Sequence, residues 1–354
     1  MPQNTHLQTV NAETESLPKP EQAGQNPRVI HEGAENLARV LTWLPNIPAS
    51  DTFTERSHAL AQNLKPIFAA FERPVHELLA FEDFRWLYDN SRLLDTDLQT
   101  TTVALKSQLK LPHVRTPNGE TVPRVLALAE GFFELVSYEF NEQEFILFVE
   151  VFQQISPLQL RELWALGPAL SLVLLEQIAA RGNRLLASPS AGSQGVGACV
   201  RSLREVEHTT WKDALESLML IDRVLEQDPA EAFGRMDFES RELYRKRVAK
   251  IARHSDCSEL EVARAVVTLA EEAKQRTYEE PRIALRESHV GYYLVDKGVD
   301  LLHQKVRFRP PIGRRIQGLM RKHPDEVLLT GIHLLTLAIM SMAVIFLTDA
   351  YTSL

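Results

Sequence analysis

The sequence predicts a mainly α-helical protein: a multi-helix cytoplasmic bundle followed by a single C-terminal transmembrane helix. Three observations support this prediction. The middle of the chain is rich in Leu, Ala, Glu and Arg, and only 15 of the 354 residues are Gly, a composition that favours helix over strand. Apolar residues recur at helical spacing through most of the chain. Near the C-terminus, residues 327–347 form a long apolar run without a charged side chain.

The helical pattern is clearest in two places. Between residues 142 and 154, four apolar side chains at positions i, i+3, i+4 and i+7 share one helix face: Phe145, Phe148, Val149 and Phe152. Later, Ser258 and Glu261 have the spacing of a capping box, in which each side chain accepts from the other's backbone amide. We therefore expect helices over both segments.

Two further segments carry distinct signals. Residues 113–121 read HVRTPNGET, and their Pro-Asn-Gly turn chemistry makes them the main candidate for a small hairpin. Residues 163–175 are nearly all apolar, but 13 residues are too few to span a bilayer. We expect a buried core helix there, starting at Ser156–Pro157, kinked at Gly167–Pro168 and ending at Gly182.

The predicted domain organisation follows from these patterns and from composition. Residues 1–28 are polar, contain three prolines and lack the apolar core of a signal peptide, so we expect a disordered lead on the cytoplasmic side. The remaining expected parts are a helical subdomain at 29–182, a Gly/Ser-rich loop at 183–200, a second helical subdomain at 201–300, a basic juxtamembrane segment at 301–326, a transmembrane helix at 327–347 and a tail at 348–354.

The membrane prediction depends on the apolar run and its flanks. Twenty-one uncharged residues at 327–347 form a helix about 30 Å long, the thickness of the bilayer core. Residues 301–322 contain seven cations and no acid, so the net charge of −8 combines +7 here with −15 elsewhere. These cations form the predicted membrane-surface basic cluster, composed of Lys305, Arg307, Arg309, Arg314, Arg315, Arg321 and Lys322.

A basic cluster beside an apolar run marks the cytoplasmic side of a membrane with anionic headgroups. We therefore expect the N-terminal domain to remain in the cytoplasm. A buried core helix is the alternative for residues 327–347, but the run is longer than a soluble helix usually needs. We expect no nucleic-acid partner, because no interleaved aromatic platform or recognition motif accompanies the cations.

Motifs that would carry chemistry are weak. Asp95-Thr96-Asp97 is formally a D-x-D, and Glu82-Asp83-Phe84-Arg85-Trp86 is one residue away from Q-x-x-R-W, two elements of processive sugar transferases. Both fall in predicted helix without a preceding strand, so we interpret them as solvated helix faces. Cys199 and Cys257 have neither CxxC spacing nor a companion His cluster. The sequence contains no phosphate-binding loop or paired-His zinc motif, so we expect no catalytic, cofactor-binding or metal-binding residues and no cofactor in this chain.

Residues 156–310 resemble a region near the start of cyclic β-1,2-glucan synthases. The matching pieces occur in one order along the chain: Pro157-Leu158, Glu162 to Leu166, Leu174 to Glu176, Asp228-Pro229, Arg235 to Phe238, Arg241, Tyr244-Arg245, Val248, Ile251 to Arg253, Ser255, Ser258-Glu259, Glu261 to Ala263, His289 to Leu294, and Asp296. The sharpest match is His289-Val290-Gly291-Tyr292-Tyr293-Leu294 with Asp296. Pro310 and His323-Pro324 then precede the membrane segment in the same order.

The resemblance implies a multi-part enzyme of the bacterial inner membrane. Such synthases contain a cytoplasmic glycosyltransferase that uses UDP-glucose and a part like a glycoside phosphorylase, and both lie beyond the region matched here. We therefore expect an N-terminal fragment, a split gene product or a truncated reading frame that is not itself catalytic. Its partners would be the remaining synthase domains or a separate glycosyltransferase chain.

The resemblance also suggests where those parts dock. Five residues form the predicted docking site: His289, Gly291, Tyr292, Tyr293 and Asp296. Tyr side chains pack and hydrogen-bond at interfaces, and a Gly permits close backbone approach. The alternative is that the same residues form a packing motif inside the domain. The alternative for the whole chain is a free-standing tail-anchored scaffold that binds partners and acts on no sugar.

Overall fold

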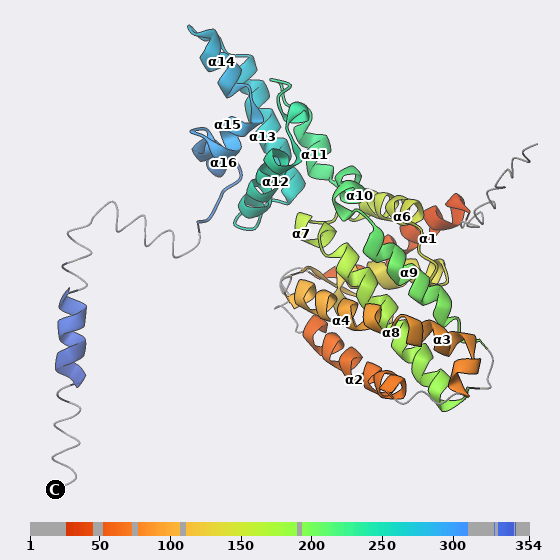
Figure 1. Cartoon of the computed structure of the whole chain (residues 1–354). Helices are drawn as coiled ribbons and strands as arrows, with labels where there is room; N and C mark the ends of the chain where they lie inside the picture. The colour runs from red at the N-terminus through yellow and green to blue at the C-terminus, as the bar shows by residue number, and fades with distance from the viewer. Residues whose placement is uncertain are drawn as a thin grey trace, which may run out of the picture. The chain divides into compact units, whose positions relative to one another are not determined.

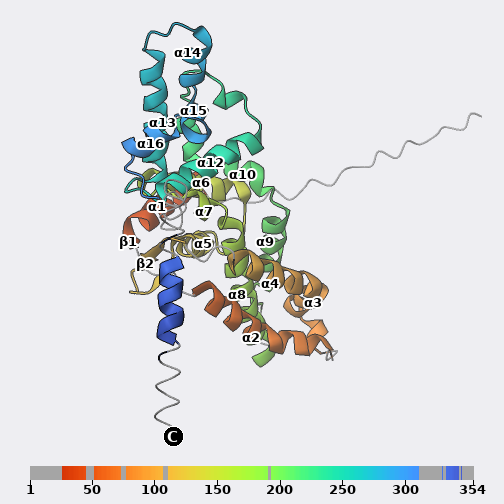
Figure 2. The same cartoon turned by 90° about the vertical axis from the view of Figure 1, so that its left-hand side faces the viewer.

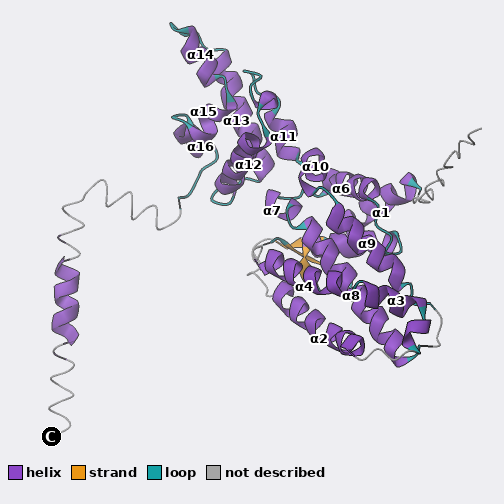
Figure 3. Cartoon of the chain, viewed as in Figure 1, coloured by secondary structure: helices purple, strands orange, loops and turns teal. Residues whose placement is uncertain are grey.

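The computed structural model describes residues 26–44, 52–72, 77–106, 111–189 and 193–310, together with 329, 332–342 and 344 near the C-terminus. Helices dominate these residues, which confirms the mainly α-helical prediction (Figures 1 and 3). The chain divides into two compact units, Met1–Leu218 and Met219–Leu354. The disordered lead expected at 1–28 lies outside the described residues up to residue 25, and a helix begins at Pro27.

The first unit is built around one long apolar helix, α8. Its helices are α1 (Pro27–Val40), α2 (Thr52–Glu72), the 3-10 turn η1 (Leu78–Ala80), α3 (Glu82–Asp89), α4 (Ser91–Lys106), α5 (Arg124–Leu135), α6 (Glu142–Ile155), α7 (Leu160–Leu163), α8 (Leu166–Ala187), α9 (Val196–His208) and α10 (Trp211–Leu218). Helix α8 packs against α2, α4, α5 and α9, and α1 packs against α6 (Figures 1 and 2). Because α8 is covered by other helices, nearly all its apolar residues are buried.

The α7–α8 stretch also tests the prediction of a core helix. Leu160–Ala187 is long enough to cross a membrane, and its most apolar 18-residue window has a mean hydropathy of 1.6, but 67% of that window is buried inside the protein. A helix buried by its own domain has no apolar surface left for lipid. It is therefore the core helix that the sequence predicts. Its ends were predicted wrongly: Gln159 caps α7, and α8 continues past Gly182 to Ala187.

Gly182 has a packing role and does not end the helix. A Cβ at this position would lie 2.6 Å from Ile67 Cδ1 and 3.2 Å from Leu87 Cδ1. Both neighbours are fully buried. The missing side chain thus lets α2 and α3 approach the α8 backbone.

Aromatic side chains fill the space between α5 and α6. Phe132 packs edge-on against Phe145 and Phe148, with ring centroids 5.0 and 5.4 Å apart. Phe145 in turn meets Trp211 of α10 at 6.0 Å. The predicted apolar face of residues 142–154 is therefore confirmed as a core face.

Two ion-paired networks bind the helices of the first unit together. Arg124 donates from Nε and Nη2 to the two carboxylate oxygens of Glu162 at 2.9 and 2.5 Å, and both side chains are buried. Arg124 also donates to Ser156 Oγ and lies 4.3 Å from the Trp43 ring centroid. In the second network, half-buried Arg56 of α2 bridges Glu130 of α5 and Glu176 of α8. Burial raises the pKa of Glu130, although Arg56 acts against the increase.

The predicted hairpin is confirmed and is part of a larger sheet. Strand β2 (His113–Arg115) pairs antiparallel with β3 (Thr121–Pro123), and β1 (Thr42–Leu44) pairs antiparallel with the other edge of β2 (Figure 2). Val114 faces both Trp43 and Val122 across the ladders. The sequence did not predict β1, because its hydrogen-bonding partners lie about seventy positions further along the chain.

The second unit surrounds α13. Its helices are α11 (Leu220–Leu225), the 3-10 turn η2 (Phe233–Arg235), α12 (Phe238–Ala252), α13 (Glu259–Lys274), α14 (Pro281–Glu287), α15 (Val290–Val295) and α16 (Val299–Lys305). Helix α13 packs against α11, α12, α14, α15 and α16. It begins at the predicted capping box, in which Ser258 and Glu261 bond to each other's backbone amide.

The boundary between the units differs from the expected one. We expected it in the Gly/Ser-rich segment 183–200, but α8 and α9 occupy both ends of that segment and pack against each other. Asp83 holds the intervening turn through Ser193 Oγ at 3.1 Å and the Val196 amide at 3.2 Å. The two compact units instead divide between Leu218 and Met219.

Candidate functional site

The predicted docking residues lie on the short helix α15 (Val290–Val295) of the second unit and at its two ends, His289 and Asp296. Gly291 and Tyr293 are buried, His289 and Tyr292 are partly buried, and Asp296 is exposed. The block therefore has a buried side, formed mainly by His289, Gly291 and Tyr293, and an exposed edge at Tyr292 and Asp296.

Asp228 organises the buried side of the block. Its carboxylate accepts from the backbone amides of Ala232, Phe233 and Val290 at 3.0, 3.1 and 3.1 Å. His289 Nδ1 lies 2.8 Å from Asp228 Oδ2. Burial alone would raise the pKa of Asp228, but the bonds from His289 and the backbone amides outweigh it and hold the pKa below its usual value.

The ionised carboxylate fixes the histidine ring. A carboxylate can only accept, so Nδ1 of His289 carries the proton that it donates to Asp228. In the neutral ring, Nε2 is then an acceptor, and the Tyr244 hydroxyl lies 3.2 Å from it. Burial, followed by the charge of Asp228, raises the pKa of Tyr244, so its hydroxyl keeps the donor proton. Asp228, His289 and Tyr244 thus form one chain of hydrogen bonds.

Gly291 belongs to the same arrangement. A Cβ at this position would overlap the Tyr244 hydroxyl and would lie 2.6 Å from His289 Nε2. The Tyr244 ring also stacks on Phe233, with centroids 6.1 Å apart. The glycine in the block is therefore explained by contacts within the second unit.

The two tyrosines of the block have different surroundings. Tyr293 is buried, and desolvation raises its pKa to about 12. Tyr292 lies at the surface edge, where Arg286 sits 5.4 Å over its ring and its hydroxyl donates to Glu287 at 3.4 Å. Tyr278 donates to the same carboxylate at 2.9 Å. Tyr292 is thus partly exposed, with its ring against Arg286 and its hydroxyl paired with Glu287.

This geometry supports the packing alternative for the buried residues. His289 and Gly291 make contacts that hold α15 against α12 and the turn after α11, and Tyr293 is buried within the second unit. Docking at the exposed edge, by Tyr292 and Asp296, remains a prediction. Sequence reasoning did not identify Asp228 and Tyr244 as partners of His289, because they lie 61 and 45 positions away.

The two weak sugar-transferase motifs lie on α3 and α4 of the first unit. Asp95 is exposed and accepts from Gln99 at 3.2 Å, whereas Asp97 is buried with Oδ2 unbonded. Burial, followed by the charge of Glu207, raises the pKa of Asp97 to about 6. The two carboxylates of D-x-D therefore lie in different environments. The solvated-face interpretation was wrong for Asp97, and also for Asp83, which is buried on α3 and accepts hydrogen bonds from the turn before α9.

The second motif borders a shallow pocket of about 360 Å³. Its lining combines side chains of α3 with Asn90 and Arg204 of α9: Glu82, Arg85, Trp86, Asp89, Asn90 and Arg204. Arg204 donates to Asn90 Oδ1, so part of the polar lining is already paired. Across the described part of the chain, no group of three or more His, Cys, Asp or Glu residues is arranged to hold a metal ion.

The predicted basic cluster is described only at its start. Lys305 Nζ lies 2.8 Å from Glu272, Arg309 Nη2 lies 2.9 Å from Asp256, and Arg307 is exposed. Arg314, Arg315, Arg321 and Lys322 lie outside the described residues. Two of the described cations are therefore partly neutralised by acids of the second unit.

Comparison with known proteins identifies a relative of this chain. It is 33% identical over 171 residues to the cyclic beta-(1,2)-glucan synthase NdvB of Rhizobium meliloti (strain 1021). The chain is related to that synthase. The aligned region is 48% of this chain and 6% of NdvB, so the chain spans only a small part of its relative's length. No family model matches the chain.

Proposed function

We propose that this chain forms the non-catalytic N-terminal helical region of a cyclic β-1,2-glucan synthase system and anchors it to the inner membrane. Transfer of glucose from UDP-glucose is carried out by a part that these 354 residues do not contain, and the helical body stays on the cytoplasmic side. The observation that carries the proposal is the 33% identity to NdvB over 171 residues.

The contacts of three buried acids support a positioning role over catalysis. Asp83 holds a turn, Asp228 is occupied by backbone amides and His289, and Asp222 pairs with the buried Arg245. Acids used in this way stabilise a fold and are not available to bind a nucleotide-linked metal. A helical body with such internal pairing suits a rigid support for another domain.

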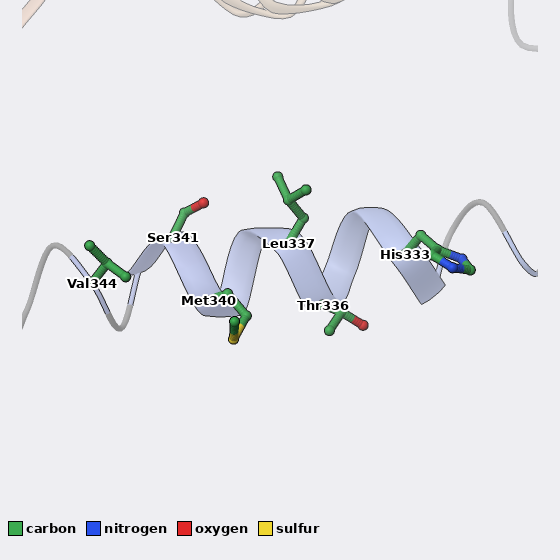
Figure 4. A pocket seen from close by; sticks show the side chains of 6 residues that line it. All are labelled: His333, Thr336, Leu337, Met340, Ser341 and Val344. Carbon is green, nitrogen blue, oxygen red and sulfur yellow. The ribbon is translucent and has the colours of Figure 1, made fainter.

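The C-terminal apolar run supports the membrane anchor. Ile332–Met342 is helical, and its apolar side chains are exposed, among them Leu334 at 65% and Leu337 at 67%. Figure 4 shows side chains projecting outward from this helix, those of His333, Thr336, Leu337, Met340 and Ser341, together with Val344 just beyond it. Apolar side chains around a helix are stable only where lipid or protein covers them. Apart from residues 329 and 344, the rest of the expected 327–347 span lies outside the described residues.

Two polar side chains of this helix contact the helix's own backbone. Thr336 Oγ1 donates to the Ile332 carbonyl at 2.7 Å, and His333 Nδ1 lies 2.8 Å from the Leu329 carbonyl oxygen. Lipid offers no hydrogen-bond partner, so polar side chains in a span need bonds of this kind. Both contacts favour the membrane interpretation.

A chimera tests the proposed function. The segment of NdvB that aligns with this chain is replaced by the corresponding 171 residues, and incorporation of labelled glucose from UDP-glucose is measured in membranes. We expect the chimera to retain most of the parent activity, and the purified chain alone to incorporate none. A chimera that is folded and membrane-bound but inactive, as inactive as a deletion of the segment, would contradict a shared role and favour a free-standing scaffold.

A further inference from the structure

A small cavity in the second unit is lined partly by basic and partly by apolar side chains. It is formed by α12, α15, α16 and the residues after α16, and its volume is about 90 Å³. Its polar lining is Arg247, Lys250 and His303, and its apolar lining is Ile251, Leu294, Val295, Val299 and Phe308. The lining contains no acid.

The two α12 cations are available to a ligand. Arg247 and Lys250 are three positions apart on one helix, so they share a face, and both are exposed. Among the residues that the structure describes, neither has an ion-pair partner. The neighbouring cations of α12 do have acidic partners: Lys246 lies 3.5 Å from Glu242, and Arg245 is buried against Asp222.

The wall of the cavity is held in place by the chain that leads toward the apolar run. Arg307 has a positive φ of 52°, and this bend returns Phe308 over His303, where the rings stack at 4.0 Å. The Phe308 amide donates to the His303 carbonyl at 2.8 Å, and the Arg309 amide donates to the His254 carbonyl at 2.7 Å. These contacts fix the position of Phe308 in the wall of the cavity. Fewer than twenty residues separate Phe308 from the start of the apolar run at residue 327.

We propose that this cavity binds a phosphate group, that of an anionic phospholipid at the membrane surface, with Arg247 and Lys250 on the phosphate and the apolar wall against the lipid's glycerol and acyl carbons. Arg and Lys are the usual partners of phosphate oxygens. The cavity volume of 90 Å³ is well below the roughly 300–1,000 Å³ of sites for drug-sized ligands. It therefore suits a single phosphate group of a lipid headgroup and not an oligosaccharide. The lipid source rests on the proposed membrane anchor.

The test uses the full chain in neutral maltoside micelles, with bound lipid counted by native mass spectrometry. The probes are phosphatidylglycerol, phosphatidylcholine and inorganic phosphate as competitor. We expect wild-type protein to retain phosphatidylglycerol in preference to phosphatidylcholine. The variant R247Q/K250Q should bind phosphatidylglycerol about tenfold more weakly, because it loses both charge-assisted contacts.

A matched control removes the same charge from the same region. K246Q/R253Q deletes two exposed cations that do not line the cavity, one within α12 and one directly after it, and should bind as wild type. Displacement of the lipid by millimolar phosphate would assign the site to free phosphate as well, whereas resistance to phosphate assigns it to lipid. Equal binding by R247Q/K250Q and K246Q/R253Q would overturn the proposal.

The outcome is separable from that of the membrane anchor. Both double variants keep residues 327–347 and should remain in membranes after carbonate washing. A wild-type chain released by carbonate would contradict the anchor, while the difference in micelle binding between the two variants would still report on the cavity.

Discussion

The hydroxyl of Tyr244 in α12 occupies the space in front of Gly291 in α15, where a side chain would otherwise project. The same hydroxyl bonds to His289, which is held in turn by Asp228. One glycine, one tyrosine and one histidine thus fix the packing of two helices. The sharpest block of the family resemblance coincides with this contact.

Gly291→Ala should destabilise the second unit by about 1–3 kcal/mol, because the added methyl group displaces Tyr244 from a packed position. Faster amide hydrogen exchange in α15 would report the effect. Gly234→Ala is the control, since a Cβ there meets nothing within 4 Å. Equal exchange in the two variants would show that the close approach has no energetic consequence.

Asp228→Asn should remove part of the acid sensitivity of the second unit. The folded pKa of Asp228 is depressed, so its stabilising contribution is complete above the unfolded value near 3.8 and is lost as pH falls through the lower folded value. Hydrogen exchange of the α12 and α15 amides between pH 5 and pH 2.5 measures this. Glu279→Gln, at an exposed site, should leave the wild-type acid dependence intact; an unchanged profile in Asp228→Asn would contradict the account.

Asp97→Asn should stabilise the first unit near pH 8. The folded pKa of about 6 lies above the ordinary 3.8, so the ionised form is disfavoured and stability falls as pH rises from 3.8 through 6. At 1.36 kcal/mol per pKa unit the penalty at high pH is about 3 kcal/mol.

The measurement for Asp97 can be confined to one unit. All four tryptophans, at positions 43, 86, 164 and 211, lie in the first unit, so their fluorescence during urea unfolding reports that unit. Asp97→Asn should flatten the dependence of the unfolding free energy between pH 4 and pH 7. Asp95→Asn, two residues away and exposed, should not; an equal effect of both would contradict the buried position of Asp97.

Arg124→Met should cost the first unit about 3–5 kcal/mol, because it leaves the buried Glu162 carboxylate without its partner. The double variant Arg124→Met/Glu162→Met should be less destabilised than this single variant, since no charge remains buried alone. Urea unfolding followed by tryptophan fluorescence gives both values. A double variant that is less stable than the single one would show that the pair contributes more than it costs.

Local sequence signals predicted the elements whose causes are local. The Ser258–Glu261 capping box, the apolar face of α6 and the Asn118–Gly119 turn each depend on residues within one helix or hairpin, and each was confirmed. Strand β1, the close approach at Gly182 and the unit boundary depend on contacts between distant segments. Contacts of this kind leave no periodic pattern in the sequence. The three features were therefore predicted wrongly or not predicted at all.

The candidate site shows the same division. The His289 block stood out in the sequence, but its role depends on Asp228 and Tyr244, which only the fold brings to it. The cavity at Arg247 and Lys250 gave no sequence signal, because its wall at Phe308 is placed by a backbone bend at Arg307.

Membrane fractionation tests the central claim most directly. Cells expressing the full chain are lysed, and their membranes are washed with 1 M salt and then with alkaline carbonate, alongside a chain lacking residues 327–347. The account predicts that the full chain stays in the pellet until detergent is added, whereas the shortened chain is released. Release of the full chain by salt or carbonate without detergent would contradict the membrane anchor.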